Sequence, residues 1–206
     1  DLVEHRLISQ TDSIYKLYVE TCKQINMPVY NSIGNWDCFS FNKYGKHENV
    51  EIQDRKKMFN QYLGDSYYSF NYKGWHFMVL DALSSIKDSE GNLVDISCID
   101  SVQIEWIKNE LDNIDTSTPI VLSTHIPFLN SRISLTTGSY EPIGPNAIID
   151  NGNDVLDLFK NHNLKLVLQG HEHNLDDINV NNKVRFITGG AVSADKWKGS
   201  RYSNNP

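Results

Sequence analysis

Residues 164–173 read LKLVLQGHEH, and this stretch indicates the class of fold. The apolar run over residues 164–169 predicts a buried strand, and Gly170 predicts a tight turn directly after it. His171 and His173 follow with one residue between them, a spacing that lets two imidazoles reach one cluster from opposite sides. Ligand sites in open α/β sheets lie beyond the carboxyl ends of the strands. We therefore expect an α/β fold with a functional site at this turn.

Two other predicted strands also end in polar residues. Residues 29–33 predict a short strand that runs into Gly34-Asn35-Trp36-Asp37, and residues 119–123 predict a buried strand that ends at Thr124-His125. Since strand ends meet at one edge of an α/β sheet, we expect Asn35, His125 and the two histidines after Gly170 to lie together. Imidazole nitrogens with amide and carboxylate oxygens suit Zn²⁺, Fe, Mn²⁺ or Ni²⁺ better than Ca²⁺.

Each of these signals has a structural interpretation when it is taken alone. A single histidine at a strand end is more often structural than a ligand, a Gly-Asn pair is usually a turn, and a lone His-x-His binds a metal in a minority of cases. Their occurrence together, each at the end of a strand, favours a metal site.

The remaining pattern alternates helices and strands. Helical spacing of apolar residues predicts helices, and aromatic or apolar alternation predicts two hairpins. The expected helices are residues 7–25, 55–63, 101–113 and 154–162, the hairpins are residues 67–80 and 177–188, and the long loops are residues 38–51 and 130–152. Without repeats or a linker, residues 1–206 are interpreted as one α/β domain.

Composition excludes several classes of protein. The chain has 206 residues, 39% of them hydrophobic, which is enough for a sizeable core, and a net charge of −7. No apolar run approaches the roughly 20 residues of a membrane span, and the acidic balance argues against non-specific nucleic-acid binding. Three scattered cysteines suit neither a disulfide framework nor a thiolate zinc site, and they do not fix the compartment. The chain begins at Asp1 without Met, so we interpret it as a segment of a longer protein.

The ordered motifs resemble those of the calcineurin-like metallophosphoesterase superfamily, which includes purple acid phosphatases and bacterial phosphodiesterases. Gly34-Asn35-Trp36-Asp37 is similar to the third block of that family, His125 to the fourth, and Gly170-His171-Glu172-His173 to the fifth. Asp1 suits the aspartate of the second block, and no Asp-x-His first block is present. The resemblance implies a two-sheet β-sandwich flanked by helices, here truncated at its N-terminus.

The resemblance also implies a function and a ligand set. The family clamps a phosphate group between two divalent metal ions and uses a metal-activated hydroxide to cleave phosphomonoesters, phosphodiesters or pyrophosphates. Asp1 would bridge two transition-metal ions (Mn, Zn, Fe or Ni), Asn35, His125 and His171 would complete one site, and His173 would contribute to the other. The expected partner is a small phosphate-containing substrate.

Trp36 departs from the family pattern, in which a histidine at this position is assigned as the general acid. An indole cannot donate an acidic proton. We therefore name no catalytic acid, and expect Trp36, Asp37 and His47 to lie on the substrate side, where Trp36 could stack on a base or sugar or merely cover the site. The alternative is a non-catalytic relative that acts as a ligand- or protein-binding module.

Overall fold

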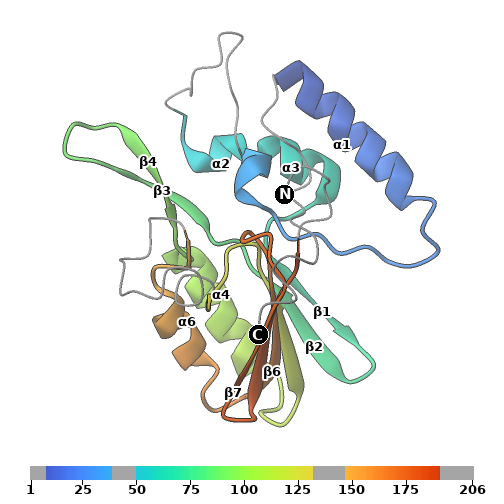
Figure 1. The fold of residues 1–206 in the computed structure, drawn as a ribbon, viewed down its shortest axis with the longest axis vertical. Coiled ribbons are helices and arrows are strands. Elements are labelled where there is room, and N and C mark those ends of the chain that lie inside the picture. Colours follow the sequence, from blue (N-terminus) through green and yellow to red (C-terminus); the bar gives the residue numbers. More distant parts are fainter. Residues whose placement is uncertain (1–7, 39–49, 132–146, 191–206) are drawn as a thin grey trace.

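The computed structural model describes residues 8–38, 50–131 and 147–190. A six-stranded sheet has the order β1-β2-β5-β6-β8-β7, and a second, two-stranded sheet pairs β3 with β4 (Figure 1). The strands of the large sheet are β1 (Tyr68–Tyr72), β2 (Trp75–Val79), β5 (Pro119–Ser123), β6 (Asn163–Gln169), β8 (Val184–Thr188) and β7 (Asp176–Val180), and those of the small sheet are β3 (Leu83–Lys87) and β4 (Leu93–Ser97). The α/β class with two sheets and flanking helices is confirmed.

The four central strands of the large sheet are parallel. β2, β5, β6 and β8 pair in parallel, whereas β1 and β7 add antiparallel edges. Ile120, Leu122 and Val167 are fully buried in this part of the sheet, as expected for parallel strands covered on both faces. Because β5 and β6 are parallel neighbours, the segments that follow Ser123 and Gln169 leave the sheet at the same edge.

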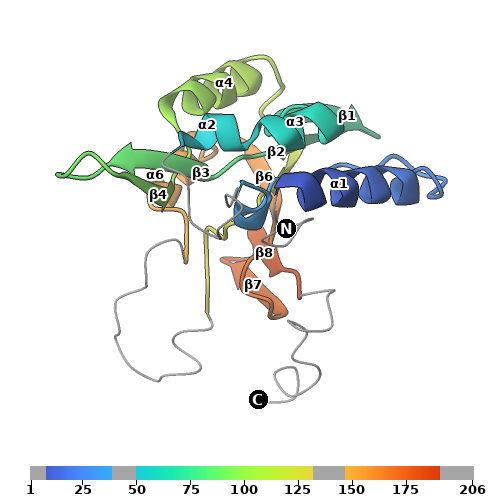
Figure 2. The same ribbon diagram turned by 90° about the horizontal axis from the view of Figure 1, so that it is seen from above.

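Helices cover one face of the large sheet and its upper edge. Figures 1 and 2 show α4 and α6 on the same face, while α1, α2 and α3 lie above the carboxyl ends of the parallel strands. Asp100 caps α4 by accepting a hydrogen bond from Gln103 N. The helices are α1 (Ile8–Cys22), α2 (Ile52–Arg55), α3 (Lys57–Leu63), α4 (Ser101–Asp112) and α6 (Gly152–Leu158).

The strand predicted for residues 29–33 is absent from the structure. The segment is held by side chains instead: Asn31 N donates to the Tyr68 hydroxyl at 2.8 Å, and the Ser32 and Ser123 hydroxyls are 2.8 Å apart. The Tyr30 ring stacks on Phe70 with ring centroids 3.7 Å apart. An apolar run becomes a strand only where a neighbouring backbone supplies the ladder, and here its neighbours supply side chains.

The hairpin of β3 and β4 was not predicted. Its turn has a local cause, because the Asp88 carboxylate accepts hydrogen bonds from Glu90 N and Asn92 N, and Gly91 adopts φ +85°. The hairpin projects away from the large sheet in Figure 1. The Arg55 guanidinium pairs with Asp95 and ties β4 to α2.

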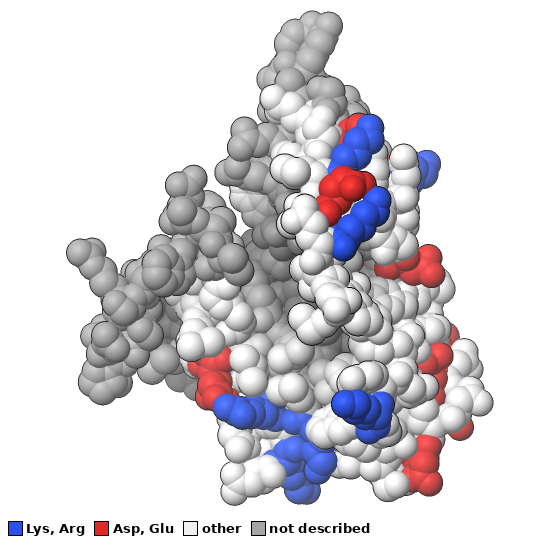
Figure 3. Space-filling model, turned by 90° about the vertical axis from the view of Figure 1, so that its right-hand side faces the viewer, with Lys and Arg blue, Asp and Glu red and all other residues white. Residues whose placement is uncertain are grey.

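The described surface carries mixed charge. Acidic and basic side chains are interspersed on the face shown in Figure 3, and several form ion pairs within one element or hairpin, such as Lys16–Asp12, Lys23–Glu20 and Arg185–Asp177. Cys22, Cys38 and Cys98 are free thiols. None of the helices in the described ranges is long and apolar enough to cross a membrane.

Candidate metal centre

Asn35 begins the 3-10 helix η1 (Asn35–Cys38), which a buried carboxylate stabilises. Gly34 N donates to Asp37 Oδ2 at 2.8 Å, and Asp37 N donates to Gly34 O at 3.0 Å. Asp37 is only 3% exposed, so this reciprocal pair closes the turn away from water. Asp37 therefore fixes the backbone from which the Asn35 side chain projects.

His125 follows β5 and stays in register with the end of β6. Thr124 N donates to Leu168 O at 2.9 Å, and Gly170 N donates to His125 O at 2.9 Å. These bonds extend the pairing of β5 and β6 beyond the sheet. The His125 ring therefore lies against the glycine turn that the sequence predicted.

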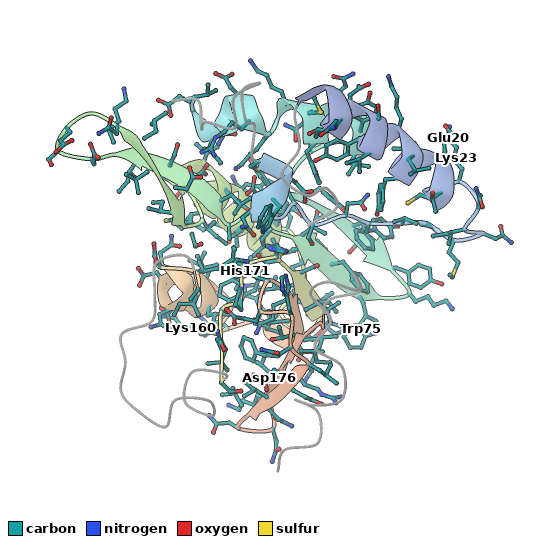
Figure 4. The ribbon with its side chains drawn as sticks, turned by 45° about the horizontal axis from the view of Figure 1, so that its top comes forward. Glu20, Lys23, Trp75, Lys160, His171 and Asp176 are labelled. Carbon is teal, nitrogen blue, oxygen red and sulfur yellow. The ribbon has the colours of Figure 1, made fainter. Side chains whose placement is uncertain are left out.

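His171 and His173 both adopt left-handed backbone conformations, with φ +70° and +57°. Glu172 N donates to Gly170 O at 2.8 Å and tightens the turn between them. Positive φ is uncommon for residues other than glycine, and such strained residues cluster at functional sites. Figure 4 shows His171 at the end of β6, where the strands meet the helical part of the molecule.

Three side-chain atoms from these three segments converge. Asn35 Oδ1 lies 2.9 Å from His125 Nε2 and 3.1 Å from His171 Nδ1, and the two nitrogens are 3.3 Å apart. The imidazole rings stand nearly perpendicular, at 80°. Nitrogen and oxygen ligands lie about 2.0–2.2 Å from a zinc ion, which places neighbouring ligand atoms about 3 Å from each other. The triangle therefore has the size of one face of a metal's coordination sphere.

Burial keeps the two imidazoles neutral. It lowers the pKa of His125 well below its usual value, and the nearby His171 and His173 lower it further. Burial also lowers the pKa of His171, with His173 adding to the effect and the Glu172 carboxylate opposing it. A histidine must be neutral to bind a metal, so both side chains have the protonation state of a ligand at neutral pH.

The cluster consists of two histidines and one amide. Within residues 8–38, 50–131 and 147–190, no group of three or more His, Cys, Asp and Glu side chains could hold a metal ion. His173 lies on the same turn as His171, and Trp36 and Asp37 lie on η1 beside Asn35. Asp1 and His47 fall outside the described residues.

Sequence reasoning missed a residue that supports this cluster and a buried ion pair outside it. Gln169, at the end of β6, is 6% exposed and hydrogen-bonds the segment that follows His125. Lys56 and Asp81 form the buried ion pair, with 2.6 Å between the charged atoms. The signal for Gln169 was a single polar residue closing an apolar strand; nothing in the sequence marks Lys56 and Asp81 as partners.

A model of a known protein family matches most of the chain. The family model described as calcineurin-like phosphoesterase matches residues 1–175, so this chain belongs to that family and is a phosphoesterase-type protein. No curated protein sequence matches the chain.

Two solved structures share the fold. A dimetal phosphatase from Danio rerio is 14% identical with a TM-score of 0.58; the match covers 88% of this chain and 66% of that one, just under two thirds of its length. The phosphopantetheinyl hydrolase PptH from Mycobacterium tuberculosis is 14% identical with a TM-score of 0.54, and the match covers 100% of this chain and 80% of that one. At this identity the likeness establishes the fold alone.

Proposed function

We propose that the protein is a metal-dependent phosphohydrolase that cleaves a phosphomonoester, a phosphodiester or a pyrophosphate link. Membership of the phosphoesterase family supports this class of reaction. The observation that carries the proposal is the triangle formed by Asn35 Oδ1, His125 Nε2 and His171 Nδ1, with every side at or below 3.3 Å.

In this proposal Asn35, His125 and His171 would hold one divalent ion, His173 would contribute to a second, and Asp1 would be shared by the two. Divalent ions act as Lewis acids: they would neutralise phosphate charge and lower the pKa of a water molecule toward neutrality. The protein's own part is to present neutral imidazoles from a buried position, to hold Asn35 in place through the Asp37–Gly34 pair, and to orient the phosphate.

Trp36 restricts the substrates that suit this site. Its indole N–H donates a hydrogen bond but supplies no acidic proton to a leaving oxygen. General acid catalysis typically contributes about 10²–10⁴ in rate, and leaving groups that are stable anions need it least. We propose that the preferred substrate is a phosphoanhydride or an aryl phosphate. We also propose that Trp36 and His47 lie on its side of the site, while the buried Asp37 acts through the turn that carries Asn35.

The test combines metal analysis with hydrolysis. Purified protein is stripped with a chelator, reconstituted with Mn²⁺, Zn²⁺ or Fe²⁺, analysed for bound metal per chain, and assayed with p-nitrophenyl phosphate, bis-p-nitrophenyl phosphate and a nucleoside diphosphate. We expect two ions per chain and metal-dependent hydrolysis of at least one substrate. His171→Ala should abolish hydrolysis while the protein stays folded.

His162→Ala is the matched control. His162 directly precedes β6, at the opposite end of that strand from His171, so its removal should leave metal content and hydrolysis unchanged. Hydrolysis that persists in His171→Ala contradicts the assignment. Metal binding by the wild-type protein without turnover of any of these substrates would favour the binding module.

A further inference from the structure

Three polar residues form a row across the edge of the large sheet. In the register of the strands, Gln169 of β6 pairs with Thr188 of β8, and Thr188 pairs with Asp176 of β7. Gln169 Nε2 donates to Thr188 Oγ1 at 3.0 Å. Gln169 and Thr188 are 6% and 3% exposed, so this part of the row is closed to water.

The row binds the segment that follows His125 at two points. Gln169 Oε1 accepts from Phe128 N at 3.0 Å, and Gln169 Nε2 donates to Leu129 O at 2.5 Å. Farther along, Asp176 Oδ2 accepts from Ser131 N at 3.3 Å and from the Ser131 hydroxyl at 2.5 Å. Residues 128–131 therefore run along the row, and backbone groups of Phe128, Leu129 and Ser131 bond to its side chains.

The row also brackets the histidine turn in the sequence. Gln169 lies two residues before His171, and Asp176 lies three residues after His173. In Figure 4, Asp176 lies below His171, at the start of β7. The strands that carry the turn thus also hold the segment that carries His125, so the row couples the two histidine-bearing segments.

We propose that Gln169, Thr188 and Asp176 are positioning residues that fix the separation of the His125 and His171 nitrogens and so set the metal affinity of the site. The inference rests on the proposed function, because it assigns those nitrogens as ligands. Hydrogen bonds in the shell outside a metal's ligands orient them, and losing such a partner typically weakens metal binding by about 10–100-fold. The row acts on the ligands through the backbone of residues 125–131.

The test measures Mn²⁺ affinity by titration calorimetry and, separately, the melting temperature of the metal-free protein. Gln169→Met keeps the volume of the side chain but removes both hydrogen bonds to residues 128 and 129, and Asp176→Ala removes the bonds to Ser131. We expect both variants to bind Mn²⁺ about 10–100-fold more weakly than the wild-type protein. Asp176→Asn keeps an acceptor oxygen and should restore the affinity to within about threefold.

Gln103→Met is the matched control for a purely structural effect. Gln103 is 2% exposed and holds a different segment in the same way, accepting from Asp81 N at 3.0 Å and donating to Asp81 O at 2.7 Å. The Gln103→Met variant should lower the melting temperature as Gln169→Met does, but its Mn²⁺ affinity should stay within about twofold of wild type.

The outcomes distinguish the positioning role of the row from the proposed metal-dependent function. Wild-type affinity in Gln169→Met, together with a melting temperature as low as that of Gln103→Met, would overturn the positioning role. If Gln169→Met does not fold, the comparison of Asp176→Ala with Asp176→Asn decides, and equal affinities overturn it. Failure of the wild-type protein to bind Mn²⁺ refutes the proposed function itself, and this inference with it.

Discussion

Acidification should destabilise the metal-free protein through His125 and His171. Burial holds the pKa of both side chains below the usual value in the fold, whereas the unfolded chain restores a pKa of about 6.5. Between these values the unfolded state binds protons that the folded state does not. Stability is therefore full above about pH 6.5 and falls as the pH drops toward the pKa values of the folded protein.

The size of the effect follows from the burial of each ring. A histidine that is charged only when unfolded costs about 1.4 kcal/mol of stability between about pH 7.5 and pH 5.5. His125 is 9% exposed and should contribute this in full, whereas His171 is only half-buried and solvent screening reduces its share. Together they should cost roughly 1–3 kcal/mol.

Urea unfolding at the two pH values, in the presence of a chelator and followed by circular dichroism, measures the loss. The comparison protein is the double variant His125→Gln/His171→Gln, which keeps amide donors near Asn35 but cannot titrate. Burial also lowers the pKa of His76, but this residue is common to both proteins and cancels in the difference. The wild-type protein should lose roughly 1–3 kcal/mol more than the double variant. Equal losses would refute the argument that these two histidines are buried in the neutral state.

Two substitutions test other parts of the molecule. Trp36→His should raise kcat for an alkyl phosphate by about 10²-fold or more while changing that for an aryl phosphate much less; an unchanged ratio of the two rates would exclude position 36 as the site of the missing acid. Lys56→Met should cost about 3–5 kcal/mol in urea unfolding, because it leaves the Asp81 carboxylate, 3% exposed, without its cation. The double variant Lys56→Met/Asp81→Leu should lose less, and a loss below about 1 kcal/mol in the single variant would contradict the prediction.

The parts of the fold that could be predicted are those whose cause lies within a few residues. The apolar runs of β5 and β6, the aromatic alternation of β1 and β2, and the apolar periodicity of α4 each define an element locally, and each is present. The strand prediction for residues 29–33 was wrong, because a strand forms only beside a neighbouring backbone, and the sequence of this segment does not contain that information. The hairpin of β3 and β4 could have been predicted, since the sequence Asp88-Ser-Glu-Gly-Asn92 is a turn signal between two short segments with strand-like residues.

In the candidate site, too, some contacts could be predicted from sequence and others could not. His125 and His171 could be placed together from sequence, because each follows a strand and strand ends meet at one edge of a sheet. Asn35 lies with them although the strand expected before it is absent. The long-range contacts could not be predicted, either beside the site or elsewhere in the fold. Gln169 bonds a segment about forty residues away in the chain, and Lys56 meets Asp81 across a helix junction and a strand end. Such pairings depend on the register of strands and on helix packing, which no local pattern encodes.

The choice of asparagine at position 35 has a physical consequence for the histidines. Asn35 Oδ1 has two lone pairs and can accept from both nitrogens that face it when each neutral ring carries its proton there. Metal binding through these nitrogens would require the other neutral tautomer of each ring. A carboxylate in the same place would favour the charged form of each ring and raise the pKa of both. Since a proton on either nitrogen competes with a metal ion, a charged partner would strengthen that competition near neutral pH. An amide instead holds the histidines together while leaving them neutral, so the same side chain can organise the cluster before a metal binds and serve as its oxygen ligand afterwards.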